Sequence, residues 1–481
     1  MIPLTLREIA EATGGRLHNT NGDEVVTGSV EFDSRKIGPG GLFVAVPGER
    51  VDGHDFAAAA VEKGAVGVLA AREVDAPSVI VPPVSAAPVR AYVLAGDKDG
   101  SGAAVLAGLA ATARAVVDRL DGLTVVGVTG SSGKTSTKDL ISQVLEPLGP
   151  TVAPPGSFNN ELGHPWTVLR ADENTKHLVL ELSARGAGHI RALCAAAPPR
   201  IGVVLNVGSA HLSEFGSRED IAQAKGELAE AATDVAVLNA DDPLVRAMAE
   251  RTKARVVLVG EHPDAAVRAE DIQLDEQARA TFRLVTSRGA ATVTLALHGA
   301  HHVGNALSAA AVGLELGADV DQIAASLSSA QRRSARRMEV TTRADGVTVV
   351  NDSYNANPES MAAALRTLAR MAGPDRRTWA VLGEMGELGV SGAEAHEEIG
   401  RLAARLGIDR LVAVTEQAGA IQHGARLEGT GTGEEHVLVP DVEAAVALLD
   451  TELRPGDVVL VKASNFVGLW RVADALLGSR A

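Results

Sequence analysis

The spacing of apolar and polar positions is most regular in the last third of the chain. Met361, Leu365, Leu368 and Met371 recur every three or four residues, which predicts a helix with one buried face. Apolar runs of strand length stand between such helical segments, namely VTVVNDS, TWAVLGE, RLVAVT, HVLVP and DVVLVKAS. Strands that alternate with helices are typical of a parallel sheet with helices on its faces. We therefore expect an α/β domain here.

The middle of the chain has the same rhythm, in the runs LTVVGVT, HLVLELS, IGVVLNVG, VAVLNAD and RVVLVG. One stretch departs from it. Residues 280–299 alternate with period two around Ser-Arg-Gly, which predicts an antiparallel hairpin. The central region is therefore expected to combine a parallel sheet with a hairpin.

Two stretches suggest domain boundaries. Residues 95–103 are small, polar and glycine-rich, which indicates a linker or exposed loop, and residues 328–340 are basic and precede a new alternating pattern. We expect three α/β domains, a small one over 1–100, a central one over 101–334 and a Rossmann-like one over 335–481.

Composition narrows the functional classes. The chain has 481 residues, a net charge of −16 and one cysteine, Cys194. An acidic chain is a poor general binder of nucleic acid, and a single cysteine excludes an internal disulfide and a zinc ribbon. The amino-terminal segment lacks the pattern of a signal peptide, and no run approaches a membrane span. These features favour the reducing cytosol.

The stretch GVTGSSGKTSTKDL carries the clearest chemistry. An apolar strand, a glycine-rich loop, a lysine and a helix in this order predict a phosphate-binding loop. Lys134 would contact the β- and γ-phosphates of a nucleotide, and Thr135 would offer its hydroxyl to Mg²⁺. Val128 stands where the common G-x-x-x-x-G-K-T pattern has glycine. The expected nucleotide loop comprises Thr129, Gly130, Ser131, Ser132, Gly133, Lys134, Thr135 and Ser136.

The variant TGSSGKT, together with LELSARGAG, NVGSAHLSEFGS, QAKGELAE and NDSYNANPESM, resembles the Mur ligases over essentially the whole chain. These are ATP-dependent amide-forming enzymes of peptidoglycan precursor synthesis. The resemblance implies that UDP-N-acetylmuramoyl-tripeptide and D-alanyl-D-alanine are joined through an acyl phosphate, giving the pentapeptide, ADP and phosphate. It also implies two Mg²⁺ ions, no nucleic-acid partner and a cytoplasmic monomer.

The resemblance assigns the amino-terminal domain to the UDP-sugar. The string DSRKIGPGGLFVAVPGERVDGHDF matches this domain of the last two ligases of the pathway, and GSFNNELGHP matches a further family motif. An arginine suits a diphosphate because its planar fork donates paired hydrogen bonds. The residues expected on the UDP-substrate are Asp33, Ser34, Arg35, Asp52, His54, Asn159 and Asn160.

The resemblance also implies the catalytic and metal residues. Glu181 and His211 would ligate the second Mg²⁺, and Lys225 would join them as a carbamate, which turns the cation into a carboxylate-like ligand. Lys134, Lys225 and His211 are therefore the expected catalytic residues, and Thr135, Glu181, His211 and Lys225 the expected metal ligands.

The remaining positions concern the nucleotide and the dipeptide. Asn305 would contact adenine, and Arg337 and Asp352 would reach ATP from a third domain that closes before chemistry. His302 and Asn465 replace residues usual in the family. The dipeptide side is expected to comprise Asn355, Asn357, Lys462 and Ser464.

Two alternatives stay open. The preceding ligase of the pathway, which adds a diamino acid, shares the ATP domain, but its D-N-P-R signature is absent and NDSYNANP favours the dipeptide-adding enzyme. An ATP-dependent switch protein would form no amide. The residues expected to ligate a second metal argue against it.

Overall fold

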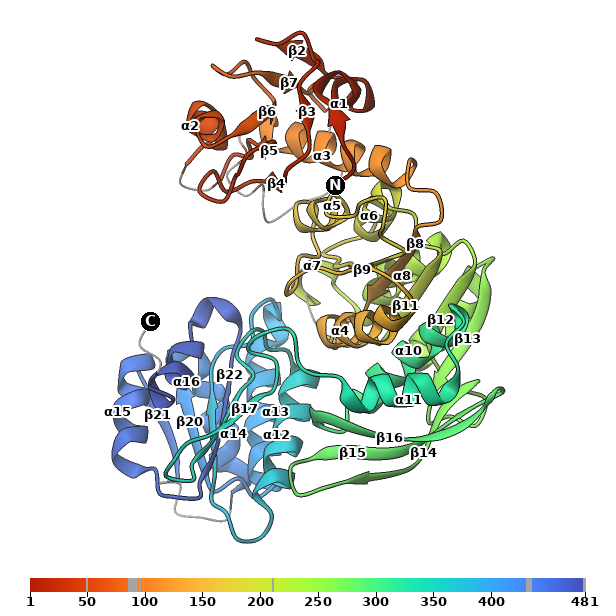
Figure 1. The fold of residues 1–481 in the computed structure, drawn as a ribbon. Coiled ribbons are helices and arrows are strands. Elements are labelled where there is room, and N and C mark those ends of the chain that lie inside the picture. Colours follow the sequence, from red (N-terminus) through yellow and green to blue (C-terminus); the bar gives the residue numbers. More distant parts are fainter. Residues whose placement is uncertain are drawn as a thin grey trace.

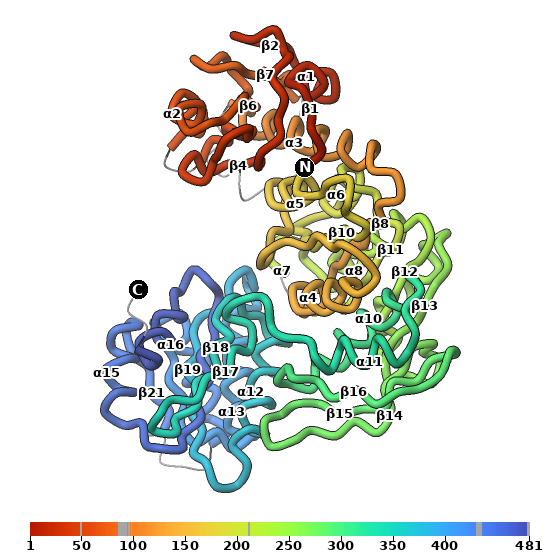
Figure 2. Tube along the Cα trace, viewed as in Figure 1, coloured from red at the N-terminus to blue at the C-terminus, as the bar shows by residue number. Residues whose placement is uncertain are grey.

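Three large β-sheets follow one another along the chain and lie along an arc, with the central sheet between the other two (Figure 1). The Cα trace has the same arrangement (Figure 2). This is a computed structural model that describes residues 1–48, 51–84, 94, 97, 99–209, 212–429 and 435–478. Among these residues no helix is both long and apolar enough to cross a membrane.

The first sheet has five strands in the order β2 (Arg16–His18), β7 (Ser78–Ile80), β6 (Ala65–Ala70), β5 (Gly41–Val44) and β4 (Val30–Glu31), parallel except for β2. A small antiparallel pair, β1 (Leu4–Thr5) and β3 (Val25–Val26), lies beside it. The helical elements here are α1 (Leu6–Thr13), η1 (Gly53–Phe56) and α2 (Ala57–Glu62).

Helix α3 (Ser101–Val117) connects the first sheet with the central one. It packs against α1 and also against α5 (Gly163–Val168) and α6 (His189–Ala196). Its buried residues Val105, Leu109 and Val116 belong to one apolar core that continues into both sheets. The loop expected over 95–103 is wrong for its last three residues, because Ser101 already begins the helix.

The central sheet has nine strands. Their order is β16 (Gly289–His298), β15 (Arg279–Thr286), β14 (Val267–Leu274), β13 (Arg255–Gly260), β12 (Val235–Asn239), β11 (Ile201–Val204), β8 (Thr124–Thr129), β10 (His177–Glu181) and β9 (Thr151–Val152). Strands β8 to β14 are parallel, and β15 and β16 form the predicted antiparallel hairpin. Strand β14, antiparallel to β15, was not predicted.

Helices cover the central sheet on both faces. Val126 and Val128 of β8 pack with α4 (Lys134–Leu145) and α10 (His302–Glu315), whereas Val125 joins the core shared with α6 and α8 (Arg218–Ala231). Cys194 of α6 is buried, and burial raises the pKa of its thiol to about 12. The remaining elements are η3 (Glu146–Leu148), α7 (Leu212–Phe215), α9 (Pro243–Arg246), η4 (Ala247–Arg251) and α11 (Val320–Ser329).

The third sheet has the order β17 (Glu339–Thr342), β18 (Thr348–Asn351), β22 (Val458–Lys462), β19 (Thr378–Leu382), β20 (Arg410–Val414) and β21 (His436–Val439). All are parallel except β17, as expected of a Rossmann-like domain. Its helical elements are α12 (Pro358–Ala372), η5 (Gly389–Ser391), α13 (Gly392–Arg405), η6 (Glu416–Ala418), α14 (Gly419–Glu428), α15 (Val442–Glu452), η7 (Asn465–Val467) and α16 (Trp470–Leu476).

Alternation along β22 explains why helices lie on both faces of this sheet. Val458 and Leu460 pack with α12, α13 and α14, whereas Val459 and Val461 pack with α15 and α16. Because the strands are parallel, their carboxyl ends share one edge, and this edge faces the central sheet across a cleft.

Candidate active site

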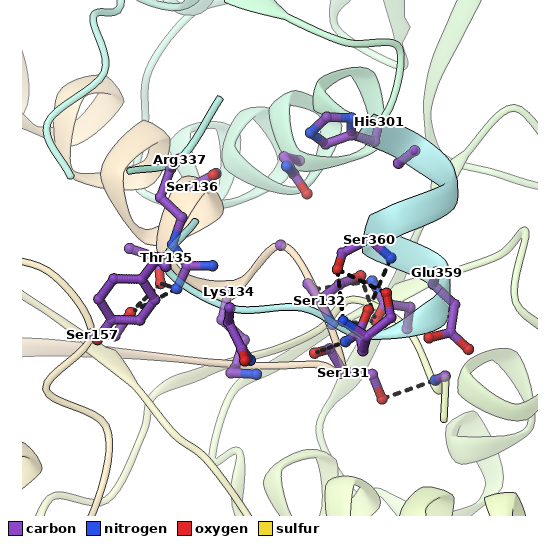
Figure 3. A pocket seen from close by; sticks show the side chains of 18 of the residues that line it. Ser131, Ser132, Lys134, Thr135, Ser136, Ser157, His301, Arg337, Glu359 and Ser360 are labelled. Atoms are coloured by element: carbon purple, nitrogen blue, oxygen red, sulfur yellow. Dashed lines mark hydrogen bonds between the residues drawn. The ribbon is translucent and has the colours of Figure 1, made fainter. Parts of the chain in front are cut away.

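The cleft between the central and third sheets holds a cavity of about 620 Å³. Figure 3 shows side chains from the loop after β8 beside side chains from the start of α12. Both sheets therefore line one cavity. The predicted residues that line it are Ser131, Ser132, Gly133, Lys134, Thr135, Ser136, Asn159, Glu181, Asn305, Arg337, Asp352, Asn355, Asn357 and Lys462. His302, which replaces a residue usual in the family, lines it as well.

The glycine-rich loop is built as a phosphate cradle. Gly133 has a φ of 81° and caps α4, which begins at Lys134. A side chain at Gly133 would be strained, and its Cβ would lie 2.8 Å from Asn305 Oδ1. Val128 is fully buried within β8, so the loop begins only at Gly130. This explains the departure from the common glycine pattern.

Residues just after the two neighbouring strands, β11 and β10, support the backbone of the loop. The Ser131 and Ser132 amides donate to the backbone oxygen and to Oδ1 of Asn206, at 3.1 and 2.9 Å. Thr129 donates its hydroxyl to the Leu182 carbonyl at 2.9 Å. Lys134 Nζ donates to the Gly130 carbonyl at 2.6 Å, so its ammonium lies over the loop. Desolvation in the cleft lowers the pKa of Lys134.

A cluster of oxygen atoms lies at the start of α4. The Thr135 hydroxyl donates to Glu181 Oε2 at 2.9 Å and lies 2.6 Å from the Ser157 hydroxyl. Asn159 Nδ2 donates to the other Glu181 oxygen at 2.7 Å. Hard oxygen donors of this kind suit Mg²⁺. The described residues contain no group of three His, Cys, Asp or Glu side chains that could hold a metal. Mg²⁺ here would therefore need phosphate or water oxygens as well.

Lys225 lies on α8 and is 2% exposed. Within the described residues its ammonium makes no hydrogen bond and no ion pair. Burial, and secondarily the charge of Lys134, lower the pKa of Lys225 well below its usual value. His211, predicted to act with it, lies outside the described residues.

The third sheet brings its own charges to the cleft. Arg337 donates to the hydroxyls of Ser157 and Thr135, at 3.1 and 3.3 Å, as Figure 3 shows. Asp352 accepts from buried Lys462 at 2.7 Å and from the Met338 amide at 3.0 Å. A cation from the third sheet thus reaches the phosphate-binding loop of the central one.

Two histidines open α10 beside the loop. Burial lowers the pKa of both His301 and His302, so both rings are neutral near pH 7. The centres of the His301 and His302 rings lie 4.2 Å apart. Asn305 Nδ2 lies 3.4 Å from His302 Nδ1. His302 therefore packs beside Asn305, and the Asn305 carboxamide lies against Gly133 of the loop.

The residues predicted for the UDP-sugar are divided between the first sheet and the central one. Arg35, an exposed side chain, pairs with Asp33 at 2.8 Å, and this arginine lowers the pKa of Asp33 to about 2. The Ser34 carbonyl accepts from Lys63 at 3.1 Å. In the central domain Asn160 Oδ1 accepts the amide of Gly163, the first residue of α5, at 2.8 Å.

Asp52 and His54 form part of the first domain's own structure. His54 is buried, and its Nε2 accepts the Ala71 amide at 3.0 Å. Its Nδ1 therefore carries the proton and donates to Asp52 Oδ1 at 2.6 Å. Both ring nitrogens are used inside the fold.

The residues predicted for the dipeptide side are not all in the cavity. Asn355, Asn357 and Lys462 line it, and Asn357 caps α12 and donates to the Ser131 carbonyl at 3.4 Å. Ser464 is buried instead, where its hydroxyl accepts the Gly386 amide at 2.9 Å.

Several residues that line the cavity were not predicted from the sequence. Ser157 lies two residues before Asn159, in the same GSFNNELGHP motif, so the motif could have indicated it. Asn206 follows β11, next to the motif of His211. Glu359 accepts the Ser209 amide at 2.8 Å from across the cleft, and only the packing of two distant segments reveals it.

Three family models match the chain. The Mur ligase family catalytic domain matches residues 28–112, the Mur ligase middle domain 128–313, and the Mur ligase glutamate ligase domain 336–465. Over 500 aligned positions the chain is 58% identical to UDP-N-acetylmuramoyl-tripeptide–D-alanyl-D-alanine ligase of Mycobacterium tuberculosis, covering 99% of this chain and 98% of that protein.

Two solved structures resemble the whole arrangement. MurF from Acinetobacter baumannii superposes with a TM-score of 0.85 at 29% identity, covering 99% of both chains. MurF ligase from Thermotoga maritima in complex with ADP superposes with a TM-score of 0.78 at 30% identity, covering 94% of this chain and 98% of that one.

Proposed function

Because the chain belongs to the Mur ligase family, we propose that it joins D-alanyl-D-alanine to UDP-N-acetylmuramoyl-tripeptide, converting ATP to ADP and phosphate. The observation that carries the proposal is the contact of Arg337 with Thr135 and Ser157. It brings a cation of the third sheet to a nucleotide loop of the central sheet. A ligase needs such a shared cleft, because nucleotide, acyl group and amine must meet there.

ATP would lie with its phosphates on the loop from Thr129 to Ser136. The amides at the start of α4 and the Lys134 ammonium supply positive charge where the γ-phosphoryl group is transferred. Asn305 would lie toward the base, and Arg337 and Asp352 would close the site from the third sheet.

Thr135 and Glu181 fit one Mg²⁺, because their oxygens lie within hydrogen-bond distance of each other beside the phosphate loop. A bound Mg²⁺ would neutralise phosphate charge. A second ion held by Glu181, His211 and a carbamylated Lys225 is part of the proposal.

A carboxylate is a poor electrophile, so it has to be activated before an amine can attack it. The tripeptide carboxylate attacks the γ-phosphorus, ADP leaves, and an acyl phosphate results. The free amine of the dipeptide attacks the acyl carbon, phosphate leaves, and the attacking nitrogen loses a proton to give the neutral amide. Lys134 and Arg337 hold the phosphoryl oxygens, so positioning and charge stabilisation supply most of the catalysis.

We propose that the UDP-sugar binds the first sheet near Arg35 and extends toward Asn159. One contact supports this path. Trp166 Nε1 donates to the Val30 carbonyl at 2.8 Å, and its ring lies 4.7 Å from that of Phe158, which precedes Asn159. We also propose domain boundaries at 100 and 334, from the sequence pattern, together with a cytoplasmic location and a monomeric state, from the composition and the family resemblance.

Lys225 has the environment that a carbamate requires. Only a neutral amine attacks CO₂, and burial lowers the pKa of the Lys225 amine, which favours the neutral form. We expect intact-protein mass spectrometry under bicarbonate to show one added CO₂ that Lys225→Ala lacks. A wild-type protein that shows only its unmodified mass would exclude the carbamate.

The decisive test is product mass spectrometry together with ATP-dependent phosphate release. One reaction contains UDP-MurNAc-tripeptide and D-Ala-D-Ala, and the other UDP-MurNAc-dipeptide and a diamino acid. We expect pentapeptide from the first alone. Turnover only in the second would identify the preceding ligase, and ATP hydrolysis without a new amide would indicate a switch protein.

A further inference from the structure

Arg336, next to the cleft residue Arg337, has a conformation that an arginine rarely adopts. Its φ is 59°, in the left-handed region that favours glycine, and Met338 two residues on has a φ of 48°. Such strain persists only where the surroundings hold it, and it gathers at functional sites. The strained segment turns Arg337 into the cleft and sends Arg336 in another direction.

The Arg336 side chain lies on an aromatic surface. Its guanidinium carbon is 4.2 Å from the centre of the Trp470 ring, at the start of α16. Stacking of this kind holds the planar group by one face and leaves the N–H groups at its rim available. Within the described part of the chain, this guanidinium donates no hydrogen bond and forms no ion pair.

The other cations along this edge are already engaged. Lys462 pairs with Asp352, and Arg471 pairs with Glu443. Arg337 donates to Thr135 and Ser157. Arg337 is also stacked on a ring, with its guanidinium carbon 4.2 Å from the centre of Tyr354. The Arg336 guanidinium therefore differs from these neighbours in having no acceptor among the described residues.

Its position is at the carboxyl edge of the third sheet, where ligands of such folds bind. The Tyr354 amide donates to the Arg336 carbonyl at 3.3 Å, and Tyr354 lines the cleft. Arg336 is adjacent in the chain to Arg337, whose guanidinium donates to Thr135 at 3.3 Å.

We propose that Arg336, held by Trp470, binds the terminal carboxylate of the incoming dipeptide and selects for a free carboxyl end. The proposal rests on the proposed ligase function. A carboxylate supplies the bidentate acceptor that the guanidinium lacks.

The test compares D-Ala-D-Ala with its carboxyl-terminal amide, at saturating ATP and UDP-MurNAc-tripeptide. The wild type should have a KM about 10- to 100-fold lower for the dipeptide than for the amide. Arg336→Gly suits the left-handed backbone and should fold. It should raise the dipeptide KM toward that of the amide, with the KM for ATP unchanged. Arg336→Lys should restore part of the preference.

Arg343→Gln is the matched control, because Arg343 pairs with Asp345 on the same sheet. It should retain the wild-type preference. The inference is overturned if Arg336→Gly also retains it, or if ATP binding is lost in parallel, since that would show a structural role. A wild type without D-Ala-D-Ala turnover would overturn the proposed function itself.

Discussion

Lys134 is the single side chain on which nucleotide chemistry depends most directly. We expect Lys134→Ala to lower ATP-dependent turnover by about 10²–10³-fold, because the transferred phosphoryl group loses its fixed cation. Binding of the UDP-substrate, measured by calorimetry, should be unchanged. The exposed Lys176→Ala variant serves as control. Loss of both nucleotide and UDP-substrate binding would instead indicate misfolding.

His164 of α5 predicts a pH dependence of stability. It is fully buried, neither ring nitrogen has a hydrogen-bond partner among the described residues, and burial lowers its pKa from 6.5 to about 4. Between pH 6.5 and pH 4, His164 is protonated in the unfolded chain but neutral in the folded chain. The folded state therefore loses up to about 3 kcal/mol as the pH falls from 6.5 to 4.

Urea unfolding of wild type and His164→Leu at pH 7 and pH 4 would measure this effect. Between pH 7 and pH 4 the free energy of unfolding should fall by up to about 3 kcal/mol less for His164→Leu than for the wild type. His423→Gln, which removes an exposed histidine, should follow the wild type. Parallel pH curves for wild type and His164→Leu would contradict a neutral buried ring.

At the scale of elements, α13 and α14 are packed through glycines. A Cβ on Gly400 would lie 1.9 Å from the Ile421 carbonyl oxygen. Gly400→Ala should therefore destabilise the third domain by about 2 kcal/mol or more, despite the higher helix propensity of alanine. Gly304→Ala in α10 meets no atom within 4 Å and should gain about 0.5–1 kcal/mol. If Gly400→Ala and Gly304→Ala changed the thermal unfolding temperature equally, close packing at Gly400 would not limit the side chain there.

Elements with strong periodicity could be predicted from sequence, and β14 shows where that fails. The strands of the parallel sheets and the 280–299 hairpin have apolar patterns that packing against one core imposes. Strand β14 carries Arg268, Glu270 and Asp271, and Asp271 has a φ of 55° where the register with β15 shifts. Its apolar positions, Val267 and Ala269 and then Ile272 and Leu274, alternate on either side of this register shift, which hides the period of two in the sequence.

The candidate site divides in the same way. The phosphate loop could be predicted because its glycines and lysine are contiguous in sequence. Arg337, Glu181 and Lys225 needed the family resemblance, because each comes from a different element. Neither the local sequence pattern nor the family resemblance predicted Glu359, because its contact with Ser209 depends on how the central and third sheets pack together.

At the scale of the whole molecule, Glu359 connects the third sheet to the central one. Its carboxylate accepts the Ser209 amide at 2.8 Å and the Ser209 hydroxyl at 3.0 Å. Glu359→Ala removes these bonds, each worth about 1 kcal/mol. Without nucleotide, the third domain should then sample more open positions.

Small-angle X-ray scattering would detect this as a larger radius of gyration than in the wild type. ATP with Mg²⁺ should restore compaction, because the nucleotide joins Lys134 and Arg337. Glu394→Ala, which changes an exposed carboxylate on α13, is the control. An unchanged scattering profile for Glu359→Ala would show that this contact does not hold the cleft.

The reactivity of the buried Cys194 thiol can report when the core around it opens to solvent. The core around its thiol spans the first and central sheets, and a thiol with a pKa of about 12 reacts only when that core is exposed. Its rate of modification therefore measures how often the two sheets separate or unfold together. Surface cysteines placed on either side of the cleft could then carry fluorophores without replacing the native residue.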